Sequence, residues 1–102
     1  MKVDLNPNEV VIKASDSNFY QSNSAIDGKL ILTNQRLFFK ADAIGAASHE
    51  VEVYPGDIQE ILYFKTGFLS PNGLNVIKKD GGEFKFKVKQ RNSWVEMINK
   101  MY

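Results

Sequence analysis

One stretch constrains the fold more than any other part of the chain. It is residues 28–40, with the sequence Gly-Lys-Leu-Ile-Leu-Thr-Asn-Gln-Arg-Leu-Phe-Phe-Lys. They have the pattern of two short strands joined by a tight polar turn. Successive side chains of a strand point to opposite faces, so Leu30 and Leu32 share one face. Leu37 and Phe39 share a face of the second strand for the same reason. The stretch therefore predicts a β-hairpin whose two apolar pairs face one core.

The rest of the chain up to residue 88 also favours strands and turns. Asn34-Gln35 is the expected hairpin turn, in which Asn34 adopts the positive φ that two-residue turns require. Turn formers also follow other strand-like runs, at Pro55-Gly56 and Asp80-Gly81-Gly82. The expected strands are residues 10–12, which Phe19-Tyr20 extends or restarts, and then residues 26–33, 36–40, 49–54, 58–65, 73–78 and 83–88. Seven strands at short spacing predict a mainly β, antiparallel sandwich or barrel.

The end of the chain has the spacing of a helix. Ser93 and Glu96 match a capping box, which predicts that the helix begins at Asn92 or Ser93. Its apolar side chains gather on one helical face; they are Trp94, Val95, Ile98, Met101 and Tyr102. A helix of about ten residues is too short to be stable alone in water, so we expect it to dock on the sheet.

Length and composition limit the class of protein. With 102 residues, the chain is expected to form one domain over residues 1–102, with a core over about residues 9–101. A charged content of 25% and an apolar content of 43% are ordinary for a globular protein and argue against disorder. The chain has no cysteine, so we expect stability from packing and not from disulfides or thiolate metal sites. The sequence has no signal-peptide run and no membrane-spanning stretch, and we expect a cytoplasmic location.

Several motifs resemble those of the GRAM domain family, whose signature is a Gly-x-Leu-x-Leu-Thr-Asn-x-Arg-Leu-x-Phe run in the second and third strands. The matching positions are Gly28, Leu30, Leu32, Thr33, Asn34, Arg36, Leu37 and Phe39. Three later family features follow in order: Pro55-x-Asp57-Ile58 leading to Ile61, Gly73-Leu74-x-Val76 with Asp80-Gly81, and Arg91-x-x-Trp94-Val95-x-x-Ile98. The resemblance spans roughly residues 9–101.

This resemblance implies a seven-stranded antiparallel pleckstrin-homology-like barrel or sandwich capped by one C-terminal α-helix. In the family fold such a helix plugs one open end of the barrel, and Trp94 would be its main anchor. Family members are associated with membrane lipids, with other proteins or with no assigned function. The resemblance therefore specifies the fold more closely than the activity.

Catalytic chemistry has little support in the sequence. His49 is the only histidine, and the sequence has no glycine-rich phosphate loop, serine-nucleophile motif, zinc-protease motif or calcium loop. Glu50 and Glu52 would share a strand face as a glycosidase-like pair does, but two solvated surface residues are the simpler interpretation. We therefore expect no enzyme, no cofactor and no metal site.

Lysines gather on the last predicted hairpin. Residues 1–60 carry five Lys/Arg against nine Asp/Glu, whereas residues 61–102 carry eight against three. If Phe84, Phe86 and Val88 point inward, the lysines between and after them form a row on the opposite face. With two more lysines across the turn, the predicted lipid-binding lysines are Lys78, Lys79, Lys85, Lys87 and Lys89. Such a row holds anionic headgroups, or it is a solvated face on which lysine protects a sheet edge.

Phe68 and Leu69 place two large apolar side chains where a loop is expected. Such a tip inserts into a membrane interface or a partner's pocket, or it folds back and caps the barrel. Residues 14–27 contain no Lys or Arg, whereas phosphoinositide-binding relatives usually carry several there, so we expect no dedicated inositol-phosphate pocket. Nucleic acid is not expected, because Phe84 and Phe86 point inward and leave no stacking platform beside the lysines.

The sequence therefore predicts a non-enzymatic binding module. The leading hypothesis is peripheral association with an anionic phospholipid surface, at the inner face of the membrane. The alternative is a protein- or peptide-interaction adaptor, in which a sheet edge beside the C-terminal helix accepts an added strand. A third hypothesis is a homo-oligomer that forms through such an edge.

Overall fold

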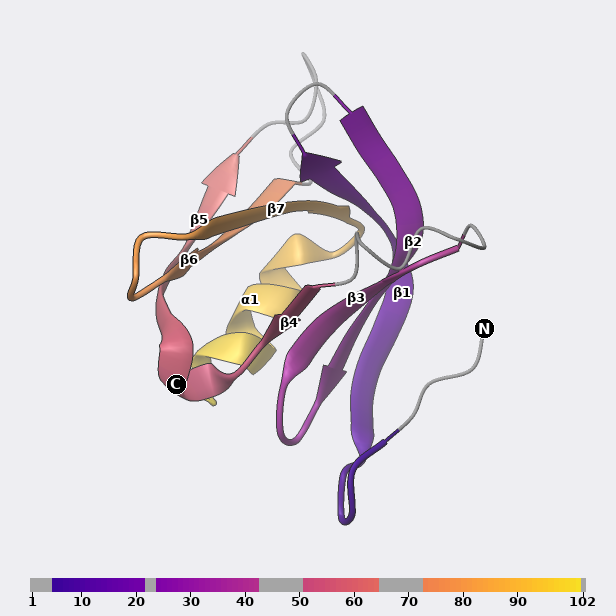
Figure 1. The fold of residues 1–102 in the computed structure, drawn as a ribbon, viewed down its shortest axis with the longest axis vertical. Coiled ribbons are helices and arrows are strands. Elements are labelled where there is room, and N and C mark those ends of the chain that lie inside the picture. The colour runs from indigo at the N-terminus through magenta and orange to yellow at the C-terminus, as the bar shows by residue number, and fades with distance from the viewer. Residues whose placement is uncertain (1–4, 22–23, 43–50, 65–72, 102) are drawn as a thin grey trace.

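The computed structural model describes residues 5–21, 24–42, 51–64 and 73–101, which form seven strands, a 3₁₀ helix and an α-helix (Figure 1). The elements are β1 (Val11–Gln21), β2 (Ser24–Thr33), β3 (Leu37–Ala41), β4 (Val51–Val53), η2 (Pro55–Asp57), β5 (Ile58–Phe64), β6 (Gly73–Lys78), β7 (Glu83–Val88) and α1 (Arg91–Asn99). The predicted strands and C-terminal helix are confirmed. β1 is one long strand, so Phe19 and Tyr20 extend the first strand and do not restart it.

The strands form one antiparallel sheet in the order β4-β3-β2-β1-β7-β6-β5. β1 connects the strands β4-β3-β2 on one side of the sheet to β7-β6-β5 on the other, because it pairs with β2 along its length and with β7 over residues 17–20. Of the strands that the structure describes, β4 and β5 each pair on one side only, so the sheet is not closed into a barrel. The sheet curls around α1, which lies against its concave face (Figure 1).

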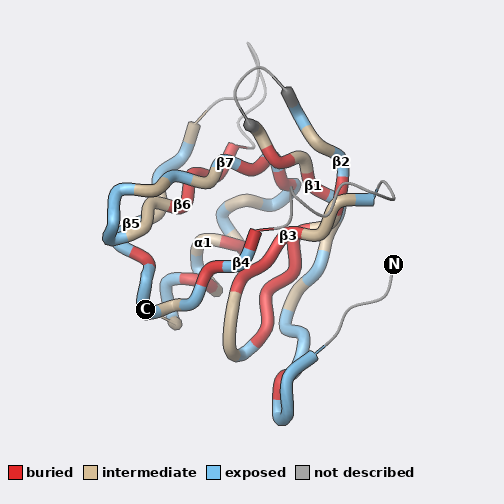
Figure 2. The backbone as a smooth tube through the Cα atoms, in the orientation of Figure 1, coloured by how far each residue is buried: buried red, intermediate tan, exposed pale blue. Residues whose placement is uncertain are grey.

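The hydrophobic core lies on this concave face, between the sheet and α1. Both apolar pairs of the hairpin, Leu30 with Leu32 and Leu37 with Phe39, are buried there as predicted. Trp94 and Ile98 are the buried side chains of α1, and both belong to the same cluster. In Figure 2, buried stretches lie along β3, β4 and β6, whereas β5 is mostly exposed or half-buried.

A second buried apolar pair lies on the opposite, convex face of the sheet. Ile31 of β2 and Phe38 of β3 are paired across the two strands and are both buried, although the core cluster does not include them. The guanidinium of Arg36 lies 4.6 Å from the centre of the Phe38 ring. The hairpin is therefore buried on both faces, a feature that simple alternation did not predict.

The turn between β2 and β3 differs from the prediction, because Asn34 does not adopt a positive φ. The Thr33 hydroxyl oxygen accepts hydrogen bonds from the backbone N–H groups of Gln35 and Arg36, each at 3.1 Å. The Thr33 N–H also donates to the Arg36 carbonyl at 2.9 Å. These bonds stabilise the loop of residues 34–36, which forms without a left-handed residue.

The start of α1 also differs from the prediction. The helix begins at Arg91, and its N-cap is Gln90 in the left-handed conformation with φ of 57°, so the predicted capping box at Ser93 and Glu96 is wrong. Arg91 Nη1 donates to the carbonyls of Phe64 at 3.0 Å and of Gly73 at 3.2 Å. These long-range bonds hold the first turn against β5 and β6, and the helix therefore begins earlier than the local signal predicts.

Candidate functional site

The β6–β7 hairpin presents lysines on the convex face of the sheet. Phe86 and Val88 of β7 are buried in the core and Phe84 packs against it, whereas Lys85 and Lys87 are exposed. Lys89, which directly follows β7, is exposed as well. The alternation expected from the sequence therefore places these lysines on the surface.

Pairing with the neighbouring strands surrounds these lysines with residues from elsewhere in the chain. Lys85 lies between Tyr20 of β1 and Asn75 of β6, and Asn75 in turn pairs with Leu62 of β5. Directly paired residues of antiparallel strands share a face, so this row runs across the convex face. A second row contains Asn18, Lys87, Gly73 and Phe64.

Two aromatic rings accompany the lysines. The Tyr20 and Phe64 rings meet edge to face with centroids 6.0 Å apart, and Lys85 Nζ lies 5.8 Å from the centre of the Phe64 ring. A Cβ at Gly73 would lie 2.8 Å from the Phe64 ring, so the glycine leaves the space that Phe64 occupies. We call Tyr20, Phe64, Lys85, Lys87 and Lys89 the lysine–aromatic face. The sequence did not predict Tyr20 and Phe64 as members of this face, because they are distant from the lysines in the chain and only strand pairing brings them together.

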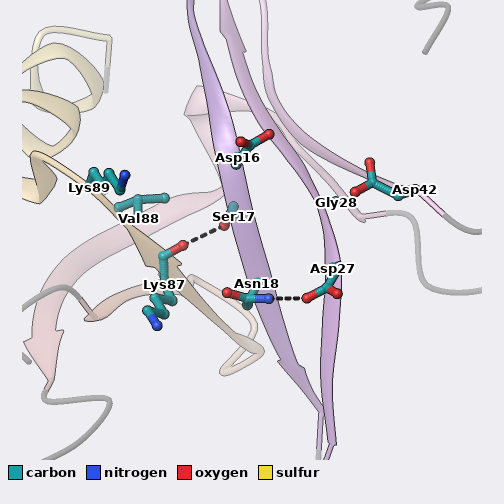
Figure 3. A pocket seen from close by; sticks show the side chains of 9 residues that line it. All are labelled: Asp16, Ser17, Asn18, Asp27, Gly28, Asp42, Lys87, Val88 and Lys89. Carbon is teal, nitrogen blue, oxygen red and sulfur yellow. Dashed lines mark hydrogen bonds between the residues drawn. The ribbon is translucent and has the colours of Figure 1, made fainter.

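Carboxylates lie along one side of the lysine–aromatic face. A cavity of about 540 Å³ lies beside β1, with Lys87 and Lys89 on one side and Asp27 and Asp42 on the other (Figure 3). Asp16 also lines this cavity, and Lys29 Nζ is 2.7 Å from its carboxylate. The hydrogen bond and charge of Lys29, with a smaller contribution from Lys89, lower the pKa of Asp16. Glu83, two residues before Lys85 on the same face of β7, adds a further carboxylate, which accepts a hydrogen bond from Asn75 Nδ2 at 2.8 Å.

Lys78 and Lys79 lie apart from the other three lysines, at the β6–β7 turn. The Lys78 side chain is only 24% exposed, and its Nζ lies 3.6 Å from the Asp80 carboxylate and 5.8 Å from the centre of the Phe84 ring. Lys79 is exposed, and its backbone N–H donates to the Asp57 carbonyl at 2.9 Å. The five lysines predicted as one site therefore form two groups.

Some predicted positions fall in parts of the chain that the structure does not describe. Phe68 and Leu69 lie within residues 65–72, and His49 and Glu50 lie within residues 43–50; both segments are outside the described residues. Glu52 is described, and its carboxylate accepts a hydrogen bond from Arg36 Nη1 at 3.1 Å. In the described ranges, acidic and histidine side chains do not form a group of three that could hold a metal ion.

The polar residues of the 28–40 stretch bind the chain's own N-terminal segment. The Glu9 side chain is fully buried, and its carboxylate accepts hydrogen bonds from Thr33 Oγ1 at 2.6 Å and from Arg36 Nε at 2.8 Å and Nη2 at 3.0 Å. Asn34 accepts from the Val10 N–H at 2.8 Å and donates to the Asn8 carbonyl at 3.0 Å. Thr33, Asn34 and Arg36 of the 28–40 stretch therefore have a structural role.

This arrangement makes stability depend on pH. The hydrogen bond from Arg36 is the main cause that lowers the pKa of Glu9 from 4.5 to about 2, against the opposing effect of burial. Because the folded pKa is lower, the stabilisation is complete above pH 4.5 and is lost as the pH falls from 4.5 toward about 2. We expect the free energy of unfolding to fall over this interval, and Glu9→Gln to fall less steeply there in urea titrations. Parallel pH profiles for the two proteins would contradict this role of Glu9.

Comparison with solved structures supports the fold. The chain is similar to the C-terminal domain of an unknown protein from Leishmania infantum, with a TM-score of 0.79 and 14% identity over 93% of this chain and 85% of that one. It is similar to the Vps36 N-terminal PH domain, with a TM-score of 0.71 and 19% identity over 95% and 81% of the two chains. The Slm1 PH domain in complex with inositol-4-phosphate gives a TM-score of 0.57 and 15% identity over 89% and 92%. These likenesses show the pleckstrin-homology-like fold.

Sequence comparisons identify the family. No curated protein matches the chain. Within the described residues, the nine-residue α1 is too short to span a bilayer. GRAM and pleckstrin-homology-like domains are commonly modules that bind lipids or proteins, and they are typically non-catalytic. The family model of the GRAM domain matches residues 1–102, and the chain therefore belongs to the GRAM domain family.

Proposed function

We propose that this domain is a non-catalytic module that binds anionic membrane surfaces peripherally through its lysine–aromatic face. The observation that carries the proposal is the contact between Lys85 and Phe64, which places an ammonium group beside an aromatic ring on an exposed sheet face. Membrane interfaces favour this combination, because aromatic rings occupy the headgroup level while lysines reach anionic lipids. The proposed location is the cytoplasmic side of a membrane, where anionic lipids are concentrated.

Three further features support the proposal. Lys85, Lys87 and Lys89 are all exposed, so their charges are available to a surface. Tyr20 and Phe64 are partly exposed, and Leu62 beside them is exposed. The Slm1 PH domain, of the same fold class, was solved with an inositol phosphate. In the present chain, residues 14–27 contain no Lys or Arg, which favours a surface contact over a pocket.

Vesicle co-sedimentation tests this function. We expect binding to phosphatidylserine-containing vesicles that weakens from low to physiological salt, and no binding to phosphatidylcholine vesicles. Lys85→Ala/Lys87→Ala should weaken binding roughly 30-fold, because each lysine near an anionic surface contributes about 1 kcal/mol. The control Lys79→Ala/Lys100→Ala removes the same charge from exposed positions off the face and should weaken binding much less.

Two results would contradict the proposal. If Lys85→Ala/Lys87→Ala keeps full vesicle binding, the face is not the contact. If both double variants lose affinity equally, the attraction depends on net charge and not on this face. Lys78 and Lys79 were predicted as part of the same site, and the control variant therefore also tests whether Lys79 contributes.

Protein binding is the second candidate function, and a different observation favours it. In the described sheet, β5 is an edge strand, and Leu62 and Tyr63 are exposed on it. An apolar edge of this kind can accept an added strand from another protein. A domain that binds neither vesicle type would support this function over membrane binding.

A further inference from the structure

The convex face of the sheet changes its charge along β7. Glu83, Lys85 and Lys87 alternate with the inward-facing residues of this strand, so they point to the convex face, and all three are exposed. Alternate residues of a strand are about 7 Å apart, so a carboxylate lies one step from an ammonium group. Glu60 of β5 is also exposed and lies in the same row as Glu83, because Ile77 of β6 pairs with both. An acidic row therefore adjoins the lysines.

The charges on the two sides of this boundary are available to a ligand. In the described ranges, Glu60, Glu83 and Lys85 form no ion pair. Lys85 Nζ lies beside the Phe64 ring, 5.8 Å from its centre, and not beside a carboxylate. The nearest opposite charge along β7 is therefore one step away, and each charge keeps the capacity to bind a group of opposite sign.

Asn75 of β6 lies at this boundary and has an unused acceptor. It pairs with Lys85, and its Nδ2 donates to the Glu83 carboxylate at 2.8 Å. The residue is only 7% exposed, and its Oδ1 has no hydrogen-bond donor among the described residues. A buried acceptor without a donor is costly, and folded proteins leave few of them. A ligand that brings an N–H group to Asn75 beside Glu83 would remove this cost.

The ligand that fits these groups carries a negative and a positive charge close together. Lys85 and Lys87 are donors that bind a phosphate. Glu83 and Asn75 Oδ1 are acceptors, and the charge of Glu83 favours a cationic donor over a neutral one. A primary ammonium group has three N–H donors, whereas the quaternary ammonium of choline has none. Phosphoethanolamine joins a phosphate to a primary ammonium through two carbons, and it therefore has both groups at short separation.

We infer that this face selects membrane lipids with a phosphoethanolamine headgroup, whose phosphate binds Lys85 and Lys87 and whose ammonium binds Glu83 and Asn75. The inference rests on the proposed function, because the headgroup is reached only when the lysine–aromatic face contacts a membrane. Anionic lipids around the headgroup still attract the lysines, so the two interactions act together. Glu60 adds negative potential on the side of the ammonium.

Two vesicle mixtures of equal surface charge test this selection. Both contain the same fraction of phosphatidylglycerol, and part of the phosphatidylcholine in one is replaced by phosphatidylethanolamine in the other. We expect co-sedimentation to show roughly fivefold tighter binding to the mixture with phosphatidylethanolamine. Because the net charge of the two surfaces is the same, long-range electrostatic attraction does not produce this difference.

Glu83→Gln separates recognition of the ammonium from other effects of phosphatidylethanolamine on the bilayer. Glutamine keeps an acceptor for Asn75 but removes the charge, so the preference should fall to less than about twofold, and binding to the phosphatidylcholine mixture should be kept. Glu96→Gln makes the same change at an exposed position of α1 and should keep the full preference. Asn75→Leu removes the unused acceptor at similar volume, and it should also lose the preference while its circular dichroism stays that of the wild type.

The outcomes distinguish this inference from the proposed function. Equal binding of the wild type to the two mixtures would overturn the selection and leave the membrane function intact. A preference that persists in Glu83→Gln would overturn it as well, because the preference would then come from the bilayer and not from this contact. A wild-type domain that binds neither mixture would contradict the proposed function and the inference together.

Discussion

Replacing Arg36 with alanine is expected to lower the free energy of unfolding by about 3–5 kcal/mol. The substitution removes the guanidinium that donates two hydrogen bonds to Glu9, and it leaves that fully buried carboxylate without its countercharge. An unpaired buried charge costs more than the lost contact itself, because the carboxylate has already given up its hydration. Urea unfolding followed by circular dichroism at neutral pH measures the change.

An exposed ion pair provides the control for Arg36. Lys29 contacts Asp16 at 2.7 Å, but its side chain is 41% exposed and that of Asp16 is 90% exposed. Lys29→Ala should therefore cost less than about 1 kcal/mol. Adding Glu9→Gln to the Arg36 variant should recover part of the lost stability, because the uncompensated charge is removed. Equal losses for Arg36→Ala and Lys29→Ala would contradict the structural role of the Glu9 to Arg36 contact.

Trp94→Ala is the second substitution with a large expected effect, again about 3–5 kcal/mol of unfolding free energy. The Trp94 side chain is fully buried in the cluster that joins α1 to the sheet. A nine-residue helix has little stability of its own, so α1 depends on this contact. Trp94 is the only tryptophan, and its variants must be followed by circular dichroism and not by intrinsic tryptophan fluorescence.

Two further variants define what Trp94 contributes. The indole N–H has no hydrogen-bond acceptor among the described residues, so Trp94→Phe loses packing volume but no hydrogen bond and should cost less than the alanine variant. Glu96→Ala, at an exposed position of the same helix, should change stability by no more than about 0.5 kcal/mol. A Trp94→Ala protein as stable as the Glu96 variant would show that α1 does not depend on this anchor.

Much of the fold could be predicted because strand geometry is local. Alternation along residues 28–40 correctly placed Leu30, Leu32, Leu37 and Phe39 in the core. The same alternation placed Lys85 and Lys87 on the surface. These predictions depend only on the two-residue period of a strand, which holds wherever the strand lies in the sheet.

Predictions that depended on distant residues were less successful. Asn34 was predicted as a local turn former and Thr33 as the end of a strand, but the side chains of both bind the segment around Glu9 and Val10. The start of α1 follows the contact of Arg91 with two carbonyls of β5 and β6, and the local capping signal at Ser93 is not used. In both cases the arrangement includes a hydrogen bond to a segment distant in the sequence, which a local pattern does not reveal.

The sequence by itself determined the strands, the helix, the family and the direction in which each strand side chain points, because these follow from short-range periodicity and turn chemistry. Only the tertiary structure decided which side chains meet. It brought Tyr20 and Phe64 to Lys85, separated Lys78 and Lys79 from the other lysines, and placed β5 at an edge of the described sheet. The physical reason is that strand order and register are set by packing and pairing between distant segments, which no local pattern encodes.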